Sequence, residues 1–151
     1  MKLARDIAEV SKKSLSNGMP YILAGWLDLL SKDFVNTEKN ARKALEVDPF
    51  NSKIIPVAGS LLRRLGQYND ALPVFTKTLE LSSNPAHWVW IEYTITLTAL
   101  KKYEKANEII EKALKTKEAG TQNTVLILNQ AAVAIYENKI EIAKERCKKA
   151  K

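Results

Sequence analysis

Small residues recur along this chain at a nearly constant interval. Gly25 and Gly59 are 34 positions apart, Ala71 and Ala106 are 35 apart, and Ala106 and Ala143 are 37 apart. An interval near 34 residues is typical of stacked supersecondary units, each too small to bury its apolar face alone. The chain has room for about four copies of such a unit, and their stacking must supply the core.

Each copy has the pattern of two α-helices joined by a short turn. Apolar residues recur every three and four positions, and no alternating run bounded by turn residues indicates a strand. We therefore expect an all-α protein, with one helix over residues 3–15 ahead of the repeats. The repeats should contain helix pairs at 20–31 and 35–47, 54–65 and 69–81, 86–100 and 103–117, and 122–136 and 139–150.

The most regular copy is the segment Ile55–Leu81. Gly59 lies midway along its first helix, Gly66 interrupts the apolar pattern, and Ala71 opens its second helix. Because Gly59 has no Cβ and Ala71 has only a methyl group, two antiparallel helices can approach closely here. This segment should form a helical hairpin.

The repeated unit resembles the tetratricopeptide repeat, whose pattern reads W-x2-L-G-x2-Y, then A-x3-F, then P. The second copy matches at Ile55, Ala58, Gly59 and Leu62, then at Ala71, Phe75 and Thr78. In the second half of the pattern, the third copy has Ala106, Ile110 and Ala113, and the fourth has Ala143, Cys147 and Ala150. Asp28, Thr37 and Thr94 depart from the pattern.

This resemblance implies a right-handed α-α superhelix of about four tetratricopeptide-like hairpins plus an N-terminal helix. The implied divisions are a capping helix at 1–19 and repeats at about 20–53, 54–87, 88–121 and 122–151. A more distant similarity, carried by NPAHWVW, YEKANEIIEKAL and AAVAIYENKIEIAKE, is to repeat regions downstream of bacterial adenylate cyclase or winged-helix regulator domains. It implies the regulatory segment of a larger signalling protein.

The concave face of such an array is the predicted binding surface, because the first helix of each hairpin lines it in this family. Trp26 and Trp88 are the expected anchors for a bound peptide or helix, and Arg63 or Arg64 should pair with an acidic group. Trp90 should instead be part of the core. The predicted groove residues are Ile22, Trp26, Leu29, Lys53, Arg63, Arg64, Trp88, Ile91, Ile95, Leu128, Ile135 and Tyr136.

The large apolar area of this surface leaves alternatives open. So much apolar area suggests a cover, which could be a partner protein, the helix predicted at 3–15 or a neighbouring domain outside this sequence. Self-association into a homodimer is a further alternative. The chaperone-clamp subtype of the family is excluded, because Ile22 and Trp26 stand where its Lys and Asn would lie.

Charge gives weaker support to nucleic-acid binding. The chain has 24 Lys and Arg against 17 Asp and Glu, a net charge of +7. Most lysines stand near glutamates, as in YEKANEIIEKALK, which is typical of solvated helix faces. Basic clusters occur only at Arg63 and Arg64 and in the tail from Lys144 onward, so a nucleic-acid partner is an unfavoured alternative.

No residue constellation predicts catalysis, a cofactor or a metal. The single histidine, His87, should be a solvated residue at a helix start rather than the base of a catalytic triad, and one histidine cannot supply a multi-histidine metal site. No glycine-rich phosphate loop occurs between a strand and a helix. We expect a protein that is not an enzyme.

The single cysteine predicts the compartment. Cys147 cannot form an internal disulfide, which is typical of a reducing environment, and should be a small buried hydrophobe. The start MKLARDIAEV lacks the apolar region of a signal peptide, and the longest apolar run, YILAGWLDLL, is too short to span a bilayer. These features predict a cytoplasmic protein without membrane insertion.

Overall fold

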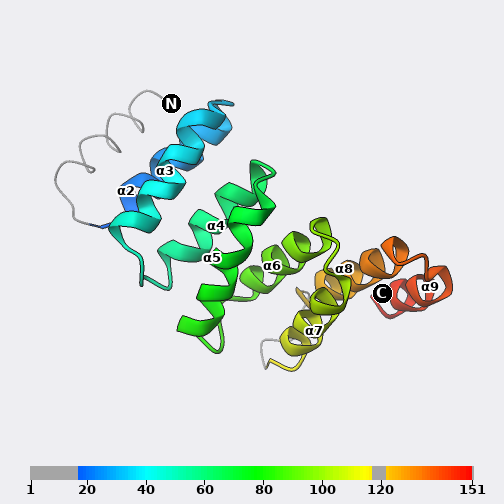
Figure 1. Ribbon diagram of the computed structural model, residues 1–151. Helices are drawn as coiled ribbons and strands as arrows, with labels where there is room; N and C mark the ends of the chain where they lie inside the picture. Colours follow the sequence, from blue (N-terminus) through cyan, green and yellow to red (C-terminus); the bar gives the residue numbers. More distant parts are fainter. Residues whose placement is uncertain (1–16, 117–121, 151) are drawn as a thin grey trace. The chain divides into compact units, whose positions relative to one another are not determined.

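The computed structural model describes residues 17–116 and 122–150, and in these ranges all regular structure is α-helical (Figure 1). The chain divides into two compact units, Met1–Ser83 and Asn84–Lys151. The first contains α2 (Met19–Leu30), α3 (Phe34–Val47), α4 (Ile54–Arg64) and α5 (Tyr68–Leu81). The second contains α6 (His87–Ala99), α7 (Tyr103–Leu114), α8 (Gln122–Tyr136) and α9 (Ile140–Lys149). The helix predicted at 3–15 lies outside the described residues.

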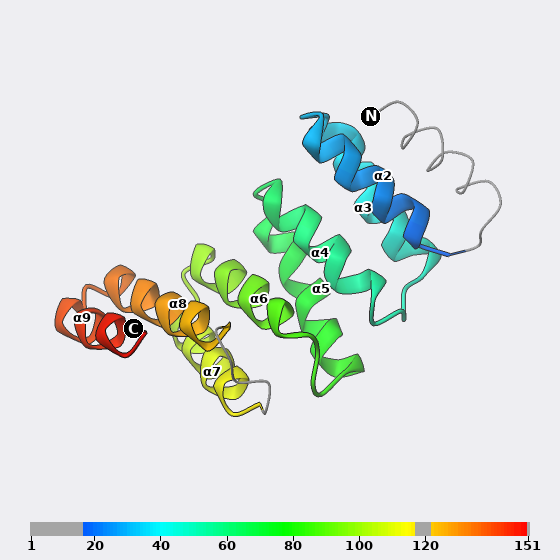
Figure 2. The same cartoon turned by 180° about the vertical axis from the view of Figure 1, so that it is seen from behind.

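Within each unit, two helical hairpins stack on one another. In the first unit α2 packs on α3 and α4 packs on α5, while α4 also contacts both α2 and α3 (Figure 2). In the second unit α6 pairs with α7 and α8 pairs with α9, while α8 contacts both α6 and α7. The predicted all-α hairpin architecture is therefore confirmed.

Gly59 lies where α4 packs closely on α5. A Cβ atom placed on it would lie 3.0 Å from Val74 Cγ1 and 3.3 Å from the Phe75 ring, and both of these side chains are buried. Ala71, on the same helix as Val74 and Phe75, is fully buried. The absence of a side chain at Gly59 thus sets the distance between the two helices, as the sequence predicts.

The turn inside each hairpin has the same geometry. One residue has a left-handed backbone in each, namely Lys32 (φ 60°), Gly66 (φ 77°), Lys101 (φ 58°) and Asn138 (φ 60°). The next residue then donates its N–H to a carbonyl five positions back, as Asp33 does to Asp28 at 2.8 Å and Gln67 does to Leu62 at 3.0 Å. This bond satisfies a carbonyl that the end of the helix leaves free.

Two departures from the repeat pattern are explained by the packing of unit 1. Asp28 and Asn40 are both buried, and the Asn40 side-chain amide donates to Asp28 Oδ2 at 2.8 Å between α2 and α3. Thr37 is fully buried, and its hydroxyl donates to the Asp33 carbonyl at 2.8 Å. The polar side chains are tolerated in the interior because each finds a hydrogen-bond partner.

Unit 2 confirms Trp90 as a core residue and corrects two predictions. His87 is only 5% exposed, rather than solvated. Since His87 and Trp90 are three positions apart on α6, they lie on the same face of the helix, and that face is the buried one. Cys147 is exposed rather than buried. Among the described helices of the unit, α9 contacts only α8, so one face of α9 is uncovered.

Candidate protein-binding surfaces

The groove residues predicted in unit 1 differ in their access to a partner. Ile22 is only 4% exposed and belongs to the core, contrary to the prediction, because α2 packs against both α3 and α4. Trp26 and Leu29 are half-buried, and Lys53 is exposed. Of the predicted groove residues on α2, those that a partner can reach therefore lie in its C-terminal half.

The structure brings two of the predicted residues together. The Arg64 guanidinium, at the end of α4, lies 5.1 Å from the centroid of the Trp26 ring on α2. At this distance the cation is attracted by the face of the indole ring, and the contact holds the long arginine side chain in place. Arg64 remains exposed, whereas Arg63 is half-buried. Of the two arginines, Arg64 is the one that can meet an acidic group.

Arg64 also lines a hollow of about 280 Å³ on unit 1. We call this surface the Arg64 hollow. Its other lining residues come from the start of α3 and from the turn between α4 and α5, and they are Phe34, Val35, Glu38, Leu65 and Gln67. Phe34 is 55% exposed and Val35 is 79% exposed. The hollow thus combines exposed apolar side chains with one exposed cation.

The carboxylate in this hollow already has a partner. Arg42 Nε donates to Glu38 Oε1 at 2.8 Å, and Arg42 also donates to Asp70 Oδ2 on α5 at 2.7 Å. The bond from Arg42, and a second one from Gln67, hold the pKa of Glu38 below its ordinary value of 4.5. Because Glu38 is engaged by Arg42, the charge that the hollow offers to a partner is that of Arg64.

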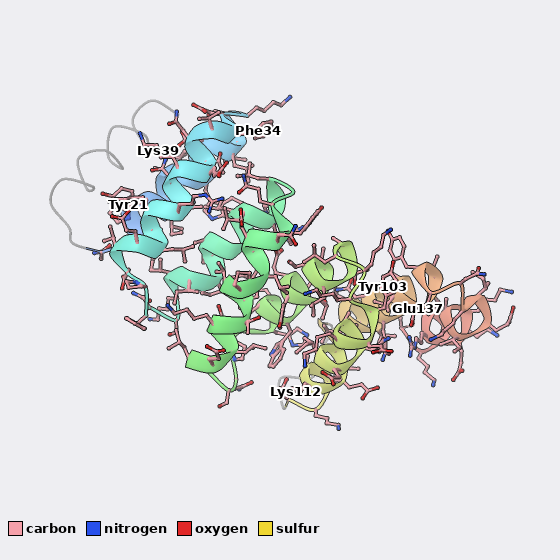
Figure 3. The ribbon with its side chains drawn as sticks, viewed as in Figure 1. Tyr21, Phe34, Lys39, Tyr103, Lys112 and Glu137 are labelled. Atoms are coloured by element: carbon pink, nitrogen blue, oxygen red, sulfur yellow. The ribbon has the colours of Figure 1, made fainter. Side chains whose placement is uncertain are left out.

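In unit 2 the predicted groove residues are more widely accessible. Trp88 is exposed on α6, and Ile91 and Ile95 are half-buried on the same helix. On α8, Leu128 is exposed, Ile135 is 54% exposed and Tyr136 is 65% exposed. One face of Tyr136 is covered, because its ring stacks on Tyr103 with centroids 6.2 Å apart and planes 5° from parallel. Figure 3 shows Tyr103 beside the end of α8, near Glu137.

Several exposed apolar residues were not predicted from the sequence to lie on a binding surface. Phe34 and Val35 begin α3, the second helix of its hairpin, whereas the family's concave positions lie on the first helix. Phe50, in the loop before α4, lies under the Lys77 ammonium, 4.5 Å from its ring centroid. Ile140 and Ile142 on α9 are exposed as well. In the sequence, the one sign of their exposure is that these large apolar residues stand beside predicted turns.

Many charges on the helices form ion pairs with a residue three or four positions away. Lys43 with Glu46 and Lys144 with Glu141 are spaced by three positions, and Arg42 with Glu38 and Lys149 with Glu145 by four. Such exposed pairs contribute little to stability but neutralise the field around each cation. The pattern favours a solvated exterior over a continuous phosphate-binding stripe.

The described residues contain no group of three or more His, Cys, Asp or Glu side chains arranged to hold a metal ion. Within the same residues, no helix is long and apolar enough to cross a membrane.

Comparison with solved structures identifies the fold. MamA from Desulfovibrio magneticus RS-1 is similar over 99% of this chain and 92% of its own, with a TM-score of 0.75 and 17% identity. YrrB, described as a TPR protein with an unusual peptide-binding site, is similar over 89% of this chain and 68% of its own, with a TM-score of 0.73 and 20% identity. PilF of Pseudomonas aeruginosa is similar over 97% of this chain and 61% of its own, with a TM-score of 0.71 and 23% identity.

No protein-family model and no curated protein matches the sequence. At these identities the likeness shows the fold alone, and that fold is the tetratricopeptide-like stack of helical hairpins expected from the repeat.

Proposed function

We propose that this chain is a protein-interaction module and that the Arg64 hollow of unit 1 binds a peptide or helix of the partner. The observation that carries the proposal is the position of Arg64, whose guanidinium lies 5.1 Å from the Trp26 ring and also lines the hollow. A fixed cation beside exposed apolar side chains is complementary to an acidic residue next to an apolar one.

Pre-organisation favours this surface over the other basic residues. An arginine loses rotamer freedom when it binds an anion, and Arg64 has lost part of that freedom already by packing on Trp26. Phe34 and Val35 expose apolar area that a partner side chain would remove from water. The bound segment should therefore carry one apolar anchor for Phe34 and Val35 and one carboxylate for Arg64.

The remaining predicted residues extend the proposal to unit 2. Trp88, Ile91, Ile95 and Leu128 offer apolar contact area on α6 and α8, of the kind that anchors amphipathic segments. The peptide-binding site named for YrrB is a property of that protein and supports the proposal only through the shared fold. A regulatory role within a larger cytoplasmic signalling protein is also part of the proposal. It rests on the sequence resemblance and on the unpaired Cys147.

Selection from a random library of 12-residue peptides displayed on phage tests the Arg64 hollow and identifies the sequence that fits it. The wild-type protein should enrich peptides with Asp or Glu one to four positions from a large apolar residue. Arg64→Glu should lose this preference and select Lys or Arg instead. Lys39→Glu makes the same charge change on the exposed surface of α3, outside the hollow lining, and should leave the selected sequences unchanged.

Synthesised peptides from the wild-type selection then provide affinities. Arg64→Ala and Phe34→Ser should each weaken binding about tenfold, and far-UV circular dichroism should show unchanged helicity. Enrichment of the same peptides by wild type and Arg64→Glu would overturn the assignment of the hollow.

A further inference from the structure

A second surface, on unit 2, is formed by α9 and the end of α8. It is a hollow of about 480 Å³, which we call the α9 trough. Its lining residues are Ile135, Ile140, Ala143, Lys144, Cys147 and Lys148. None of them belongs to the Arg64 hollow, so this surface is independent of the proposed function.

The trough follows one face of a helix. Ile140, Ala143, Lys144, Cys147 and Lys148 have the spacing of residues on a single helical stripe. α9 has 10 residues, so this stripe is about 15 Å long and can contact roughly three turns of another helix. Ile135, which is 54% exposed, extends the apolar floor onto the last turn of α8.

The equivalent stripe on α7 shows what such a face normally contacts. In the repeat register Cys147 corresponds to Ile110, and Ile110 is fully buried. α7 contacts both α6 and α8, whereas among the described helices of this unit α9 contacts only α8. A helix is thus the element that covers this stripe elsewhere in the same unit, and a helix laid on α9 would cover Ile140 and Cys147.

The polar residues of the trough specify the charge of that helix. Both are lysines, Lys144 and Lys148, one helical turn apart, and no carboxylate is found among the described residues that line the trough. Lys144 Nζ pairs with Glu141 at 2.7 Å, but both side chains are more than half exposed, and such a pair is readily exchanged. The neighbouring cations are engaged elsewhere, since Arg146 donates to the Gln130 carbonyl and Lys149 pairs with Glu145.

Charge also argues against two other candidate occupants of the trough, namely residues 1–16 of this chain and the α9 trough of a second copy. Residues 1–16 carry Lys2, Arg5, Lys12 and Lys13 against Asp6 and Glu9, a net charge of four minus two, or +2. A second copy related by twofold symmetry would bring the same two lysines of each trough toward one another, which is unfavourable in an apolar interface. A partner helix with carboxylates flanking its apolar stripe has no such conflict.

We propose that the α9 trough binds an acidic amphipathic helix of a partner protein. Apolar side chains of that helix contact Ile135, Ile140 and Cys147, and its carboxylates pair with Lys144 and Lys148.

The chain supplies its own reporter for this interaction. Cys147 is the only cysteine of the sequence, is exposed and lines the trough. The probe is a 14-residue helical peptide with Leu at positions 3, 6, 7 and 10 and Glu on both flanks of that stripe. A control peptide has Lys in place of every Glu. The Glu peptide should slow the reaction of Cys147 with a thiol reagent at least tenfold at saturation, and the Lys peptide should not.

Matched pairs of variants on the same helix test the geometry. Ile140→Asp and Lys148→Glu change the trough and should each weaken binding of the Glu peptide, measured by fluorescence anisotropy, at least tenfold. Ile142→Asp and Lys149→Glu make the same changes at exposed neighbours outside the lining and should alter the affinity by less than twofold. Lys148→Glu should in addition improve binding of the Lys peptide.

Three outcomes would overturn the proposal. The first is equal binding of the Glu and Lys peptides, and the second is an equal effect of both variants within each matched pair. The third is a wild-type dimer in sedimentation that Ile140→Asp converts to monomer, which would assign the trough to a second copy of the chain.

Discussion

Enlarging Gly59 tests the helix packing on which the register of unit 1 depends. In Gly59→Leu the new side chain must enter the contact between α4 and α5, where Cβ alone would lie 3.0 Å from Val74 Cγ1 and 3.3 Å from two atoms of the Phe75 ring. Val74 is β-branched and has one strongly preferred rotamer in a helix, and Phe75 is fully buried, so neither side chain can move aside cheaply.

Two opposing terms set the size of the effect. Replacing a mid-helix glycine with a good helix former stabilises the helix by about 1 kcal/mol. Overpacking a dense core costs about 1–3 kcal/mol and sometimes more, and leucine adds four carbon atoms. We expect Gly59→Leu to lower the free energy of unfolding by about 2 kcal/mol or more, and Gly59→Ala to lower it by about 1 kcal/mol.

Gly25 provides the matched control on α2. A Cβ there would lie 2.8 Å from Leu61 Cδ1, the far end of a flexible side chain, and 3.5 Å from Asn40 Cβ. Because the nearest atom is the terminal methyl of a flexible leucine rather than a β-branched carbon or a ring, the gain in helix propensity should offset most of the crowding, and Gly25→Ala should stay within about 1 kcal/mol of wild type.

Urea unfolding followed by circular dichroism at 222 nm measures all three variants. With a slope of about 1–3 kcal/mol per M, the Gly59→Leu midpoint should fall by roughly 1 M or more. An unchanged midpoint and slope for Gly59→Leu would refute the close approach of α4 and α5. An equal loss for Gly25→Ala and Gly59→Ala would show that the nature of the contacted atoms does not decide the effect.

The described contacts support four further predictions. Asp28→Ala and Asn40→Ala should each cost about 1–3 kcal/mol, because each removes one side of the buried hydrogen bond between them, and a double-mutant cycle should show that the losses do not add. His87→Leu should keep or raise the melting temperature, since neither ring nitrogen has a partner among the described residues; a clear loss would contradict this. Since the folded-state pKa of Glu38 is below its ordinary value of 4.5, its contribution to stability is present above that value and is lost as pH falls through the folded-state pKa. A carbon-13 NMR titration should therefore place the Glu38 midpoint below 4.5, and Arg42→Ala should raise it. Single-stranded RNA should bind weakly and lose its binding steeply between 50 and 200 mM salt, and salt-resistant binding would contradict the interpretation of the lysines as solvated.

The helices were predictable because their ends carry local signals. The prediction of 54–65 compares with Ile54–Arg64 in the structure, and that of 103–117 with Tyr103–Leu114. Gly66, with φ of 77°, marks its turn in the sequence. Lys32 and Lys101 adopt the same left-handed backbone without any such signal, because the hydrogen bonds of the turn impose it.

The polar and surface residues were less predictable because their environment comes from other helices. Asp28 looks like a departure from the repeat until Asn40, on the next helix, is seen to bind it. His87 is buried because it shares a face of α6 with Trp90, although its position at a helix start suggests solvation. The Arg64 side chain is held in position by its contact with the Trp26 ring on a different hairpin. Each of these pairings depends on how two helices are placed in space.

One position of the repeat shows why function is harder to predict than fold in such a chain. Ala41, Phe75 and Ile110 occupy it in the first three hairpins and are fully buried, while Cys147 occupies it in the fourth and is exposed. In a stacked array the burial of a repeated position is set by the neighbouring helix as much as by the residue itself. Binding surfaces therefore arise where a repeated position lacks the neighbour that covers its equivalents. That rule selects the α9 trough, whose lysines then determine the charge of the helix that fits it.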